Sequence, residues 1–200
     1  MKYLGFIFIA IGILTFAALT TVIIPALQLA QEPAEPDLKP YTEQELQGRS
    51  VYIKNGCIYC HSQQPRDPSF GVDQKRNWGR ASTPGDYAFD RPHLLGTMRT
   101  GPDLLNIGAR QPSQDWHLLH LYQPRAVLPN SVMPSYPYFF RHKDKIDPGE
   151  VSINIPSEWL REKGKKVIVT QEALDLVAYL KSLNRTYPAT QKPMKERRRD

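Results

Sequence analysis

The sequence contains only two cysteines, Cys57 and Cys60, and they lie three positions apart. A small secreted protein held together by disulfides would need more cysteine pairs at wider spacing. This scarcity excludes a disulfide framework and indicates that the two thiols serve local chemistry.

Charged side chains are absent from residues 3–29, and residues 4–24 are almost wholly apolar. About 20 such residues are needed to cross the ~30 Å hydrocarbon core of a membrane. A cleaved signal peptide is the alternative, but its apolar core has only about 7–15 residues and ends in small residues. Here the run is longer, and Gln28 stands where a cleavage site would need a small residue. We therefore expect a retained transmembrane helix that anchors the chain in membrane lipid.

The charges that flank this apolar run predict its orientation. Lys2 precedes the run, whereas Glu32, Glu35 and Asp37 follow it. Positively charged flanks stay in the cytoplasm. We therefore expect a single-pass protein of the inner (cytoplasmic) membrane, with everything after residue 30 on the periplasmic, extracytoplasmic side.

The formal net charge of +6 does not indicate a nucleic-acid-binding protein. Much of the excess falls in residues 192–200, which show no hydrophobic periodicity and which we interpret as solvated. We expect no nucleic acid among the partners. The predicted organisation is a cytoplasmic N-terminus and transmembrane anchor at 1–30, a proline-rich spacer at 31–41, a folded domain at 42–186 and a flexible basic tail at 187–200.

Signals for three helices lie within the predicted domain. Thr42-Glu43-Gln44-Glu45 fits a capping box that opens a helix through Tyr52. Ser113 is suited to cap a second helix, and a third begins near Thr170, where apolar residues follow helical spacing. Long tracts rich in proline, glycine and tyrosine separate these helices and show no strand alternation. We expect a mostly α-helical fold whose helices alone make a poor core, so that another component fills its centre.

Cys57-Ile58-Tyr59-Cys60-His61 is the C-x-x-C-H pattern of covalent haem attachment. Two thiols at this spacing can form thioethers with the two vinyl groups of one porphyrin, and the next residue brings an imidazole beneath the iron. A redox dithiol would need a surrounding βαβ pattern, and a zinc site would need four ligands. The sequence shows neither that pattern nor histidines paired with the cysteines. It therefore predicts one haem c, bound through Cys57 and Cys60, with His61 as an iron ligand.

Met133 is the predicted second iron ligand. It lies in the proline-stiffened sequence Ser131-Val132-Met133-Pro134-Ser135. A methionine ligand suits an electron carrier because it raises the reduction potential, and a filled site keeps oxygen away from the iron. Met98 is the alternative ligand, and core filling is the ordinary role of any methionine.

Three further residues are candidates for holding the haem. Gly101-Pro102 can turn the chain and offer the Pro102 carbonyl to the free N–H of a metal-bound histidine, although a simple turn explains the same residues. Arg99 and Arg110 could pair with the haem propionates through bidentate contacts. Either arginine could equally be a solvated surface charge.

Several of these segments resemble subunit II of cbb3-type cytochrome c oxidase, a membrane-anchored subunit with one haem in a class I cytochrome c domain. The resemblance covers residues 1–140, whereas residues 139–170 form a shorter and more charged connection than this family usually has. The resembling stretches are Cys60-His61-Ser62-Gln63, residues 85–92, residues 95–104, residues 116–125 and residues 133–137.

The resemblance implies that residues 42–186 form a class I cytochrome c domain with His61 and Met133 as the axial pair and Pro102 supporting His61. It also implies a non-catalytic electron-transfer subunit of a membrane-bound haem-copper oxidase. The implied partners are the catalytic oxidase subunit and other c-type cytochromes. Oxygen reduction would then occur on another subunit.

Two other functions share the plan of one membrane helix and one haem. They are the cytochrome c subunit of nitric oxide reductase and a free-standing, membrane-tethered cytochrome c shuttle. Gly101-Pro102-Asp103-Leu104 and the sequence from Met133 to Pro137 favour the oxidase over nitric oxide reductase.

Overall fold

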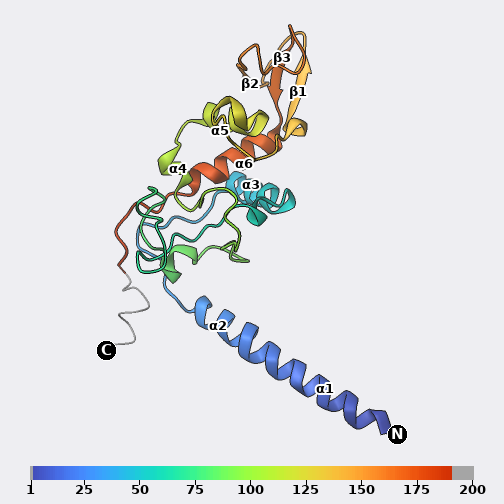
Figure 1. Ribbon diagram of the computed structural model, residues 1–200, viewed down its shortest axis with the longest axis vertical. Coiled ribbons are helices and arrows are strands. Elements are labelled where there is room, and N and C mark those ends of the chain that lie inside the picture. Colours follow the sequence, from blue (N-terminus) through green and yellow to red (C-terminus); the bar gives the residue numbers. More distant parts are fainter. Residues whose placement is uncertain (1, 191–200) are drawn as a thin grey trace. The chain divides into compact units, whose positions relative to one another are not determined.

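The computed structural model describes residues 2–190 and is 41% helix and 5% strand. The mostly helical fold class and the apolar N-terminal helix predicted from the sequence are confirmed (Figure 1). Two compact units make up the chain. The first comprises the described residues of Met1–Leu38, Thr83–Arg91 and Ala189–Asp200, and the second comprises Lys39–Ser82 and Pro92–Pro188. The predicted tail at 187–200 lies outside the described residues from residue 191 onward.

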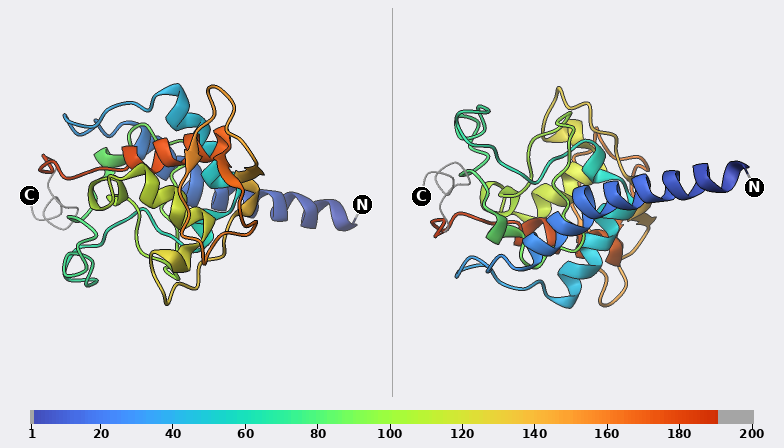
Figure 2. Two further views of the ribbon diagram at one scale, coloured as in Figure 1. Left: turned by 90° about the horizontal axis from the view of Figure 1, so that it is seen from above. Right: turned by 90° about the horizontal axis from the view of Figure 1, so that it is seen from below.

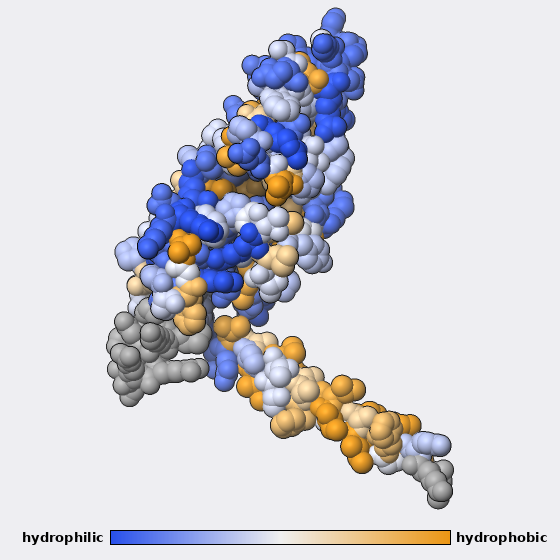
Figure 3. Space-filling model, in the orientation of Figure 1, coloured by the Kyte–Doolittle hydropathy of each residue, from blue (hydrophilic) through white to orange (hydrophobic). Residues whose placement is uncertain are grey.

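The N-terminal helix is long and apolar enough to cross a membrane. It runs over Tyr3–Ala30, or 28 residues, which at 1.5 Å per residue gives about 42 Å against a ~30 Å hydrocarbon core. It consists of α1 (Lys2–Ala18), a π-helical turn η1 (Leu19–Ile23) and α2 (Ile24–Ala30). Hydrophobic residues, orange in Figure 3, cover it along its length.

The π-helical turn lies directly before Pro25, which has no N–H to donate. In a regular helix the proline ring would clash with the carbonyl four residues earlier. Here the N–H of Ile24 reaches the carbonyl of Leu19, five residues back. The hydroxyls of Thr20 and Thr21 also bond inside the helix, to the carbonyls of residues 16 and 17 at 2.9 and 2.7 Å. Polar groups are thereby satisfied within the helix, as a lipid environment requires.

The spacer after this helix is held by a buried carboxylate, Glu35, which is only 1% exposed. One carboxylate oxygen accepts a hydrogen bond from the Thr83 hydroxyl at 2.7 Å. The other accepts from the N–H and the hydroxyl of Thr190, at 2.9 and 2.6 Å. The backbone N–H of Glu35 donates to the Gly85 carbonyl at 3.3 Å. Three distant segments of the first unit therefore meet at one side chain, and we call this set the Glu35 clasp.

The three helix starts predicted from capping residues are confirmed. At α3 (Glu43–Lys54), the Thr42 hydroxyl accepts from the Glu45 N–H at 3.3 Å, and the Glu45 carboxylate accepts from the Thr42 N–H at 2.7 Å. Ser113 caps α5 (Gln114–Tyr122), and Thr170 caps α6 (Gln171–Ser182). The remaining helical elements are short: α4 (Ile107–Arg110) and the 3₁₀ turns Cys57–Tyr59, Pro84–Tyr87, Pro124–Ala126 and Pro137–Phe139.

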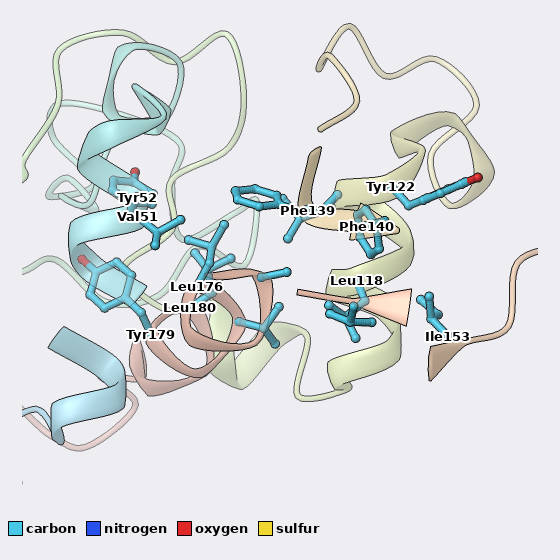
Figure 4. Packing of buried hydrophobic residues seen from close by; sticks show 14 of the residues in the cluster. Val51, Tyr52, Leu118, Tyr122, Phe139, Phe140, Ile153, Leu176, Tyr179 and Leu180 are labelled. Carbon is cyan, nitrogen blue, oxygen red and sulfur yellow. The ribbon is translucent and has the colours of Figure 1, made fainter. Parts of the chain in front are cut away.

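Helix α6 forms the centre of the second unit, with α3 on one side and α5 on the other (Figure 1 and the left view of Figure 2). Val51 and Tyr52 of α3 lie against Leu176, Tyr179 and Leu180 of α6 (Figure 4). The two helices approach closely at Gly48, where an added Cβ would overlap the carbonyl of residue 175. This contact joins an early segment of the domain to its last helix.

A small antiparallel sheet precedes α6, in a tract where the sequence predicted no strand. Strands β1 (Phe140–Lys143) and β2 (Ser152–Ile153) both pair with β3 (Lys166–Val169), in the order β1-β3-β2. The expectation of a tract without strands is wrong because strands of two to four residues are too short to show alternation. The β-branched run Val167-Ile168-Val169 is buried and favours extended backbone.

The close approach at Gly48 predicts the effect of one methyl group. Gly48→Ala should destabilise the domain by about 1–3 kcal/mol, because the added atom meets backbone that cannot move aside. Chemical denaturation followed by circular dichroism measures this loss. Gly71→Ala is the control, since its Cβ would have ordinary contacts of 3.4 Å or more, and it should change stability by less than ~0.5 kcal/mol. Helix propensity alone favours alanine over glycine, so a gain in stability for Gly48→Ala would contradict the packing described.

Candidate functional site

The two cysteines lie on a tight turn attached to the end of α3. Gly56 follows the helix with a φ of 68°, a left-handed conformation that glycine adopts without strain. The chain then enters the 3₁₀ turn Cys57–Tyr59, where the Cys57 carbonyl accepts from the N–H groups of Cys60 and His61 at 3.2 and 3.0 Å. Both thiols are free. The turn therefore holds the two thiols and the imidazole of His61 on one rigid support.

The His61 ring is fixed from two directions. Its Nδ1 lies 2.8 Å from the Pro102 carbonyl, so Nδ1 carries the proton and Nε2 is the nitrogen left to bind a metal. The N–H of Gly101 donates to the Cys60 carbonyl at 2.9 Å, and a Cβ at Gly101 would overlap the imidazole. Burial lowers the pKa of His61. The ring is therefore neutral at pH 7, which is the form that coordinates metals.

The buried carboxylate of Asp103 holds Pro102 in place. Asp103 accepts hydrogen bonds from the Ser62 hydroxyl and the Gln64 N–H, both at 2.6 Å, and from the Leu105 N–H at 3.0 Å. Burial raises the pKa of Asp103, while these hydrogen bonds act in the opposite direction. The segment after His61 and the segment after Pro102 are thus joined through one side chain.

A cavity of about 490 Å³ lies beside His61, within the ~300–1,000 Å³ range of small-molecule and cofactor sites. Its wall includes Cys57, Cys60, His61 and Met133. Most of the other lining residues are apolar and come from several segments of the second unit, among them Leu104, Ile107, Leu121, Leu128, Pro129, Val132, Leu176 and Leu180. The cavity therefore brings two thiols, an imidazole and a thioether together in a largely apolar space.

The two candidate methionines differ in position. Met133 is half-buried, packs against the hydrophobic core and lines the cavity, and its N–H donates to the Ser131 hydroxyl at 3.2 Å. Met98 is 57% exposed and is not among the cavity-lining residues. Only Met133 therefore shares the cavity with His61.

Arg99 and Arg110, the expected propionate partners, are engaged outside the cavity wall. The Arg99 guanidinium pairs with Asp73 at 2.8 Å and donates to the Gln64 carbonyl at 2.7 Å. Arg110 donates to the backbone carbonyl of Asp103. Neither arginine lines the cavity. In this structure both brace the loops that carry His61 and Pro102.

Helix α5 supplies aromatic residues to the cavity wall. Trp116, His117 and His120 all line the cavity. His117 is buried and its Nε2 lies 2.8 Å from the Gln111 carbonyl. The His120 ring stacks on Trp116, with centroids 4.8 Å apart and planes 10° apart. The i, i+4 spacing of Trp116 and His120 is the sequence signal that places them on one helix face.

These residues fit a covalently bound haem better than the two alternatives. The pair of thiols is followed by an imidazole whose Nε2 is available, and a thioether lies in the same cavity. No strand lies beside the cysteines in the second unit to form the βαβ setting of a redox dithiol. Within residues 2–190, no three side chains of His, Cys, Asp or Glu are grouped as a metal site, so the geometry does not support zinc.

Comparison with known proteins agrees with this chemistry. The family model described as cytochrome c oxidase, mono-haem subunit/FixO, matches residues 2–159. The match includes the N-terminal helix, the C-x-x-C-H turn and Met133. No curated protein matches the chain.

The buried His117 predicts a loss of stability in acid. Burial lowers its pKa from 6.5 to about 4, so between these values the unfolded chain binds a proton that the folded chain excludes. The stabilisation is complete above pH 6.5 and is lost as the pH falls towards 4, by about 3 kcal/mol in total. Denaturation at a series of pH values should show that the free energy of unfolding falls more steeply in acid for the wild type than for His117→Gln. Equal pH dependence of the two proteins would contradict a neutral, buried His117.

Proposed function

The chain belongs to the cytochrome c oxidase mono-haem subunit/FixO family, and on that premise we propose that it is the electron-transfer subunit of a membrane-bound cbb3-type haem-copper oxidase. The observation that carries the proposal is the meeting of Cys57, Cys60, His61 and Met133 in one apolar cavity. When bound, haem c would supply one iron that cycles between Fe(II) and Fe(III).

The attachment turn and its supports would hold the haem. Cys57 and Cys60 would form the two thioether links, and the Nε2 of His61 would bind the iron. The Pro102 carbonyl, 2.8 Å from Nδ1, fixes the ring and increases the basicity of the coordinating nitrogen. Gly101 leaves room for the imidazole at its close approach to the backbone.

Met133 would supply the second iron ligand. Its thioether favours Fe(II) and so raises the potential of the carrier. The apolar residues of the cavity wall would limit the access of water to the metal. With both positions filled, oxygen cannot bind here. Oxygen reduction therefore belongs to the catalytic haem-copper subunit, to which this chain passes electrons received from other c-type cytochromes.

The Glu35 clasp favours a fixed subunit over a free-swinging shuttle. A tether that lets a domain move between complexes should be an unbonded, extended chain. Here Glu35 is 1% exposed and is bonded to Thr83 and Thr190. The apolar helix Tyr3–Ala30 would anchor this unit in the inner membrane, with the N-terminus cytoplasmic and the haem domain periplasmic.

Purification of the full-length chain in mild detergent tests the proposal. Copper and high-spin haem in co-purifying subunits support the oxidase. A haem protein of 22.9 kDa that purifies alone supports the shuttle. A co-purifying catalytic subunit with non-haem iron in place of copper indicates nitric oxide reductase.

Covalent attachment predicts that haem stays with the chain after denaturation. A denaturing gel stained for haem peroxidase activity should show a positive band for the wild type, and the pyridine haemochrome should report saturated vinyl groups at both links. Cys57→Ala or Cys60→Ala should also lower the level of folded protein, because an unfilled cavity loses packing contacts. A normal yield of folded, haem-free domain from either variant would contradict the idea that haem completes the core.

The methionine assignment predicts different effects of two leucine substitutions. Met133→Leu should remove the weak iron–sulfur charge-transfer band of the oxidised protein and lower its potential, because the thioether's preference for Fe(II) is lost. Leucine has nearly the volume of methionine, so packing should cost less than ~1.5 kcal/mol. Met98→Leu is the matched control and should leave band and potential unchanged. Loss of the band in Met98→Leu alone would reverse the assignment.

The Glu35 clasp predicts protection of the spacer from proteases. Glu35→Ala removes the acceptor of three hydrogen bonds. Losing even one hydrogen bond to a charged acceptor costs about 1.5 kcal/mol. This loss should raise the fraction of molecules whose spacer is detached from Thr83 and Thr190 roughly tenfold. Limited proteolysis of residues 33–40 should accelerate accordingly. Asp37→Ala is the control because Asp37 is exposed, and equal cleavage rates for the two variants would show that the clasp does not restrain the spacer.

A further inference from the structure

Besides the expected iron ligands His61 and Met133, the cavity wall includes two histidines of α5, His117 and His120. His120 lines the cavity together with His61 and Met133. Imidazole is a common axial ligand of haem iron and competes well with a thioether for the ferric state. Two histidines of α5 reach the cavity, so their surroundings decide which of them is available.

His117 is already committed to another contact. Its side chain is buried, and its Nε2 lies 2.8 Å from the Gln111 carbonyl. His120 differs, because its buried Nδ1 has no hydrogen-bond partner within residues 2–190. A buried polar group without a partner is rare and points to a role that the bare chain does not show. His120 is therefore the available imidazole.

Two further features suit His120 to coordination. Trp116 stacks on the ring at 4.8 Å and 10°, which fixes its plane. Burial is the main cause that lowers the pKa of His120 to about 4, and the nearby His61 contributes, so the His120 ring is neutral at pH 7. The free imidazole thus lies in the neighbourhood of His61 in its metal-binding form.

We propose that His120 is a reserve axial ligand, which binds the iron when the Met133 thioether leaves it. This inference rests on the proposed function. In the exchange one iron–sulfur bond breaks and one iron–nitrogen bond forms. No electron or proton is transferred, because the incoming imidazole is neutral. The product has two nitrogen ligands, so its potential lies below that of the resting pair.

Spin state tests the exchange without reference to oxidase activity. Full-length Met133→Leu, purified in detergent and oxidised, should contain low-spin, six-coordinate haem by electron paramagnetic resonance and visible absorption. Adding His120→Phe should convert it to high-spin haem, since phenylalanine keeps the stacking on Trp116 but has no nitrogen. Met133→Leu with His117→Gln is the matched control and should remain low-spin. If the His120→Phe protein does not accumulate, His120→Leu replaces it.

The outcomes separate this inference from the function on which it rests. High-spin haem in the Met133→Leu single variant would overturn the inference. Low-spin haem that persists when His120 is also replaced would overturn it too. If the protein with His117→Gln becomes high-spin and the protein with His120→Phe stays low-spin, the reserve role belongs to His117. This result would also overturn the inference. An iron–sulfur band that survives Met133→Leu would refute the Met133 assignment and this inference with it. By contrast, wild-type protein without covalent haem would refute the proposed function itself.

Discussion

The Pro102 carbonyl lies 2.8 Å from Nδ1 of His61, and this single contact determines which ring nitrogen can meet a metal. Other parts of the site serve to keep it. Asp103 fastens the loop behind Pro102 to Ser62 and Gln64, while Gly101 gives the imidazole its space. A rotated or protonated ring would leave the two thiols without the ligand that completes their chemistry. The site is therefore organised around the orientation of one imidazole.

The hydrophobic core and the cavity share the same helices. Tyr52 of α3 and Leu176 and Leu180 of α6 belong to the buried cluster, and the same residues line the cavity. Without an occupant these side chains lose contacts on one side, and such a gap costs stability. On the proposed function, folding and haem attachment would therefore be linked through the contact between α3 and α6. The small sheet β1-β3-β2 enlarges the core beyond α5, where Phe140 and Ile153 are buried.

Local signals made part of this structure predictable. The capping residues Thr42, Ser113 and Thr170, the apolar run and the C-x-x-C-H pattern each act within a few residues, so the sequence reveals them directly. The roles of Arg99 and Arg110 were not predictable in the same way. A guanidinium binds any acceptor that the fold brings near, and Asp73 lies 26 positions from Arg99. The sheet was not predictable because strands of two to four residues are too short to show a repeated alternation.

The Glu35 clasp also has a consequence in time. Thr190 is synthesised 155 residues after Glu35, so the ribosome delivers the last partner of this carboxylate only after the rest of the described chain has emerged. The anchor helix and the cysteine turn can settle earlier, because their contacts form within shorter stretches. Until residue 190 is synthesised, Glu35 can bond to Thr83 and Gly85 but lacks its two hydrogen bonds from Thr190. The clasp thus closes as a late event of biosynthesis, after residue 190 has been synthesised.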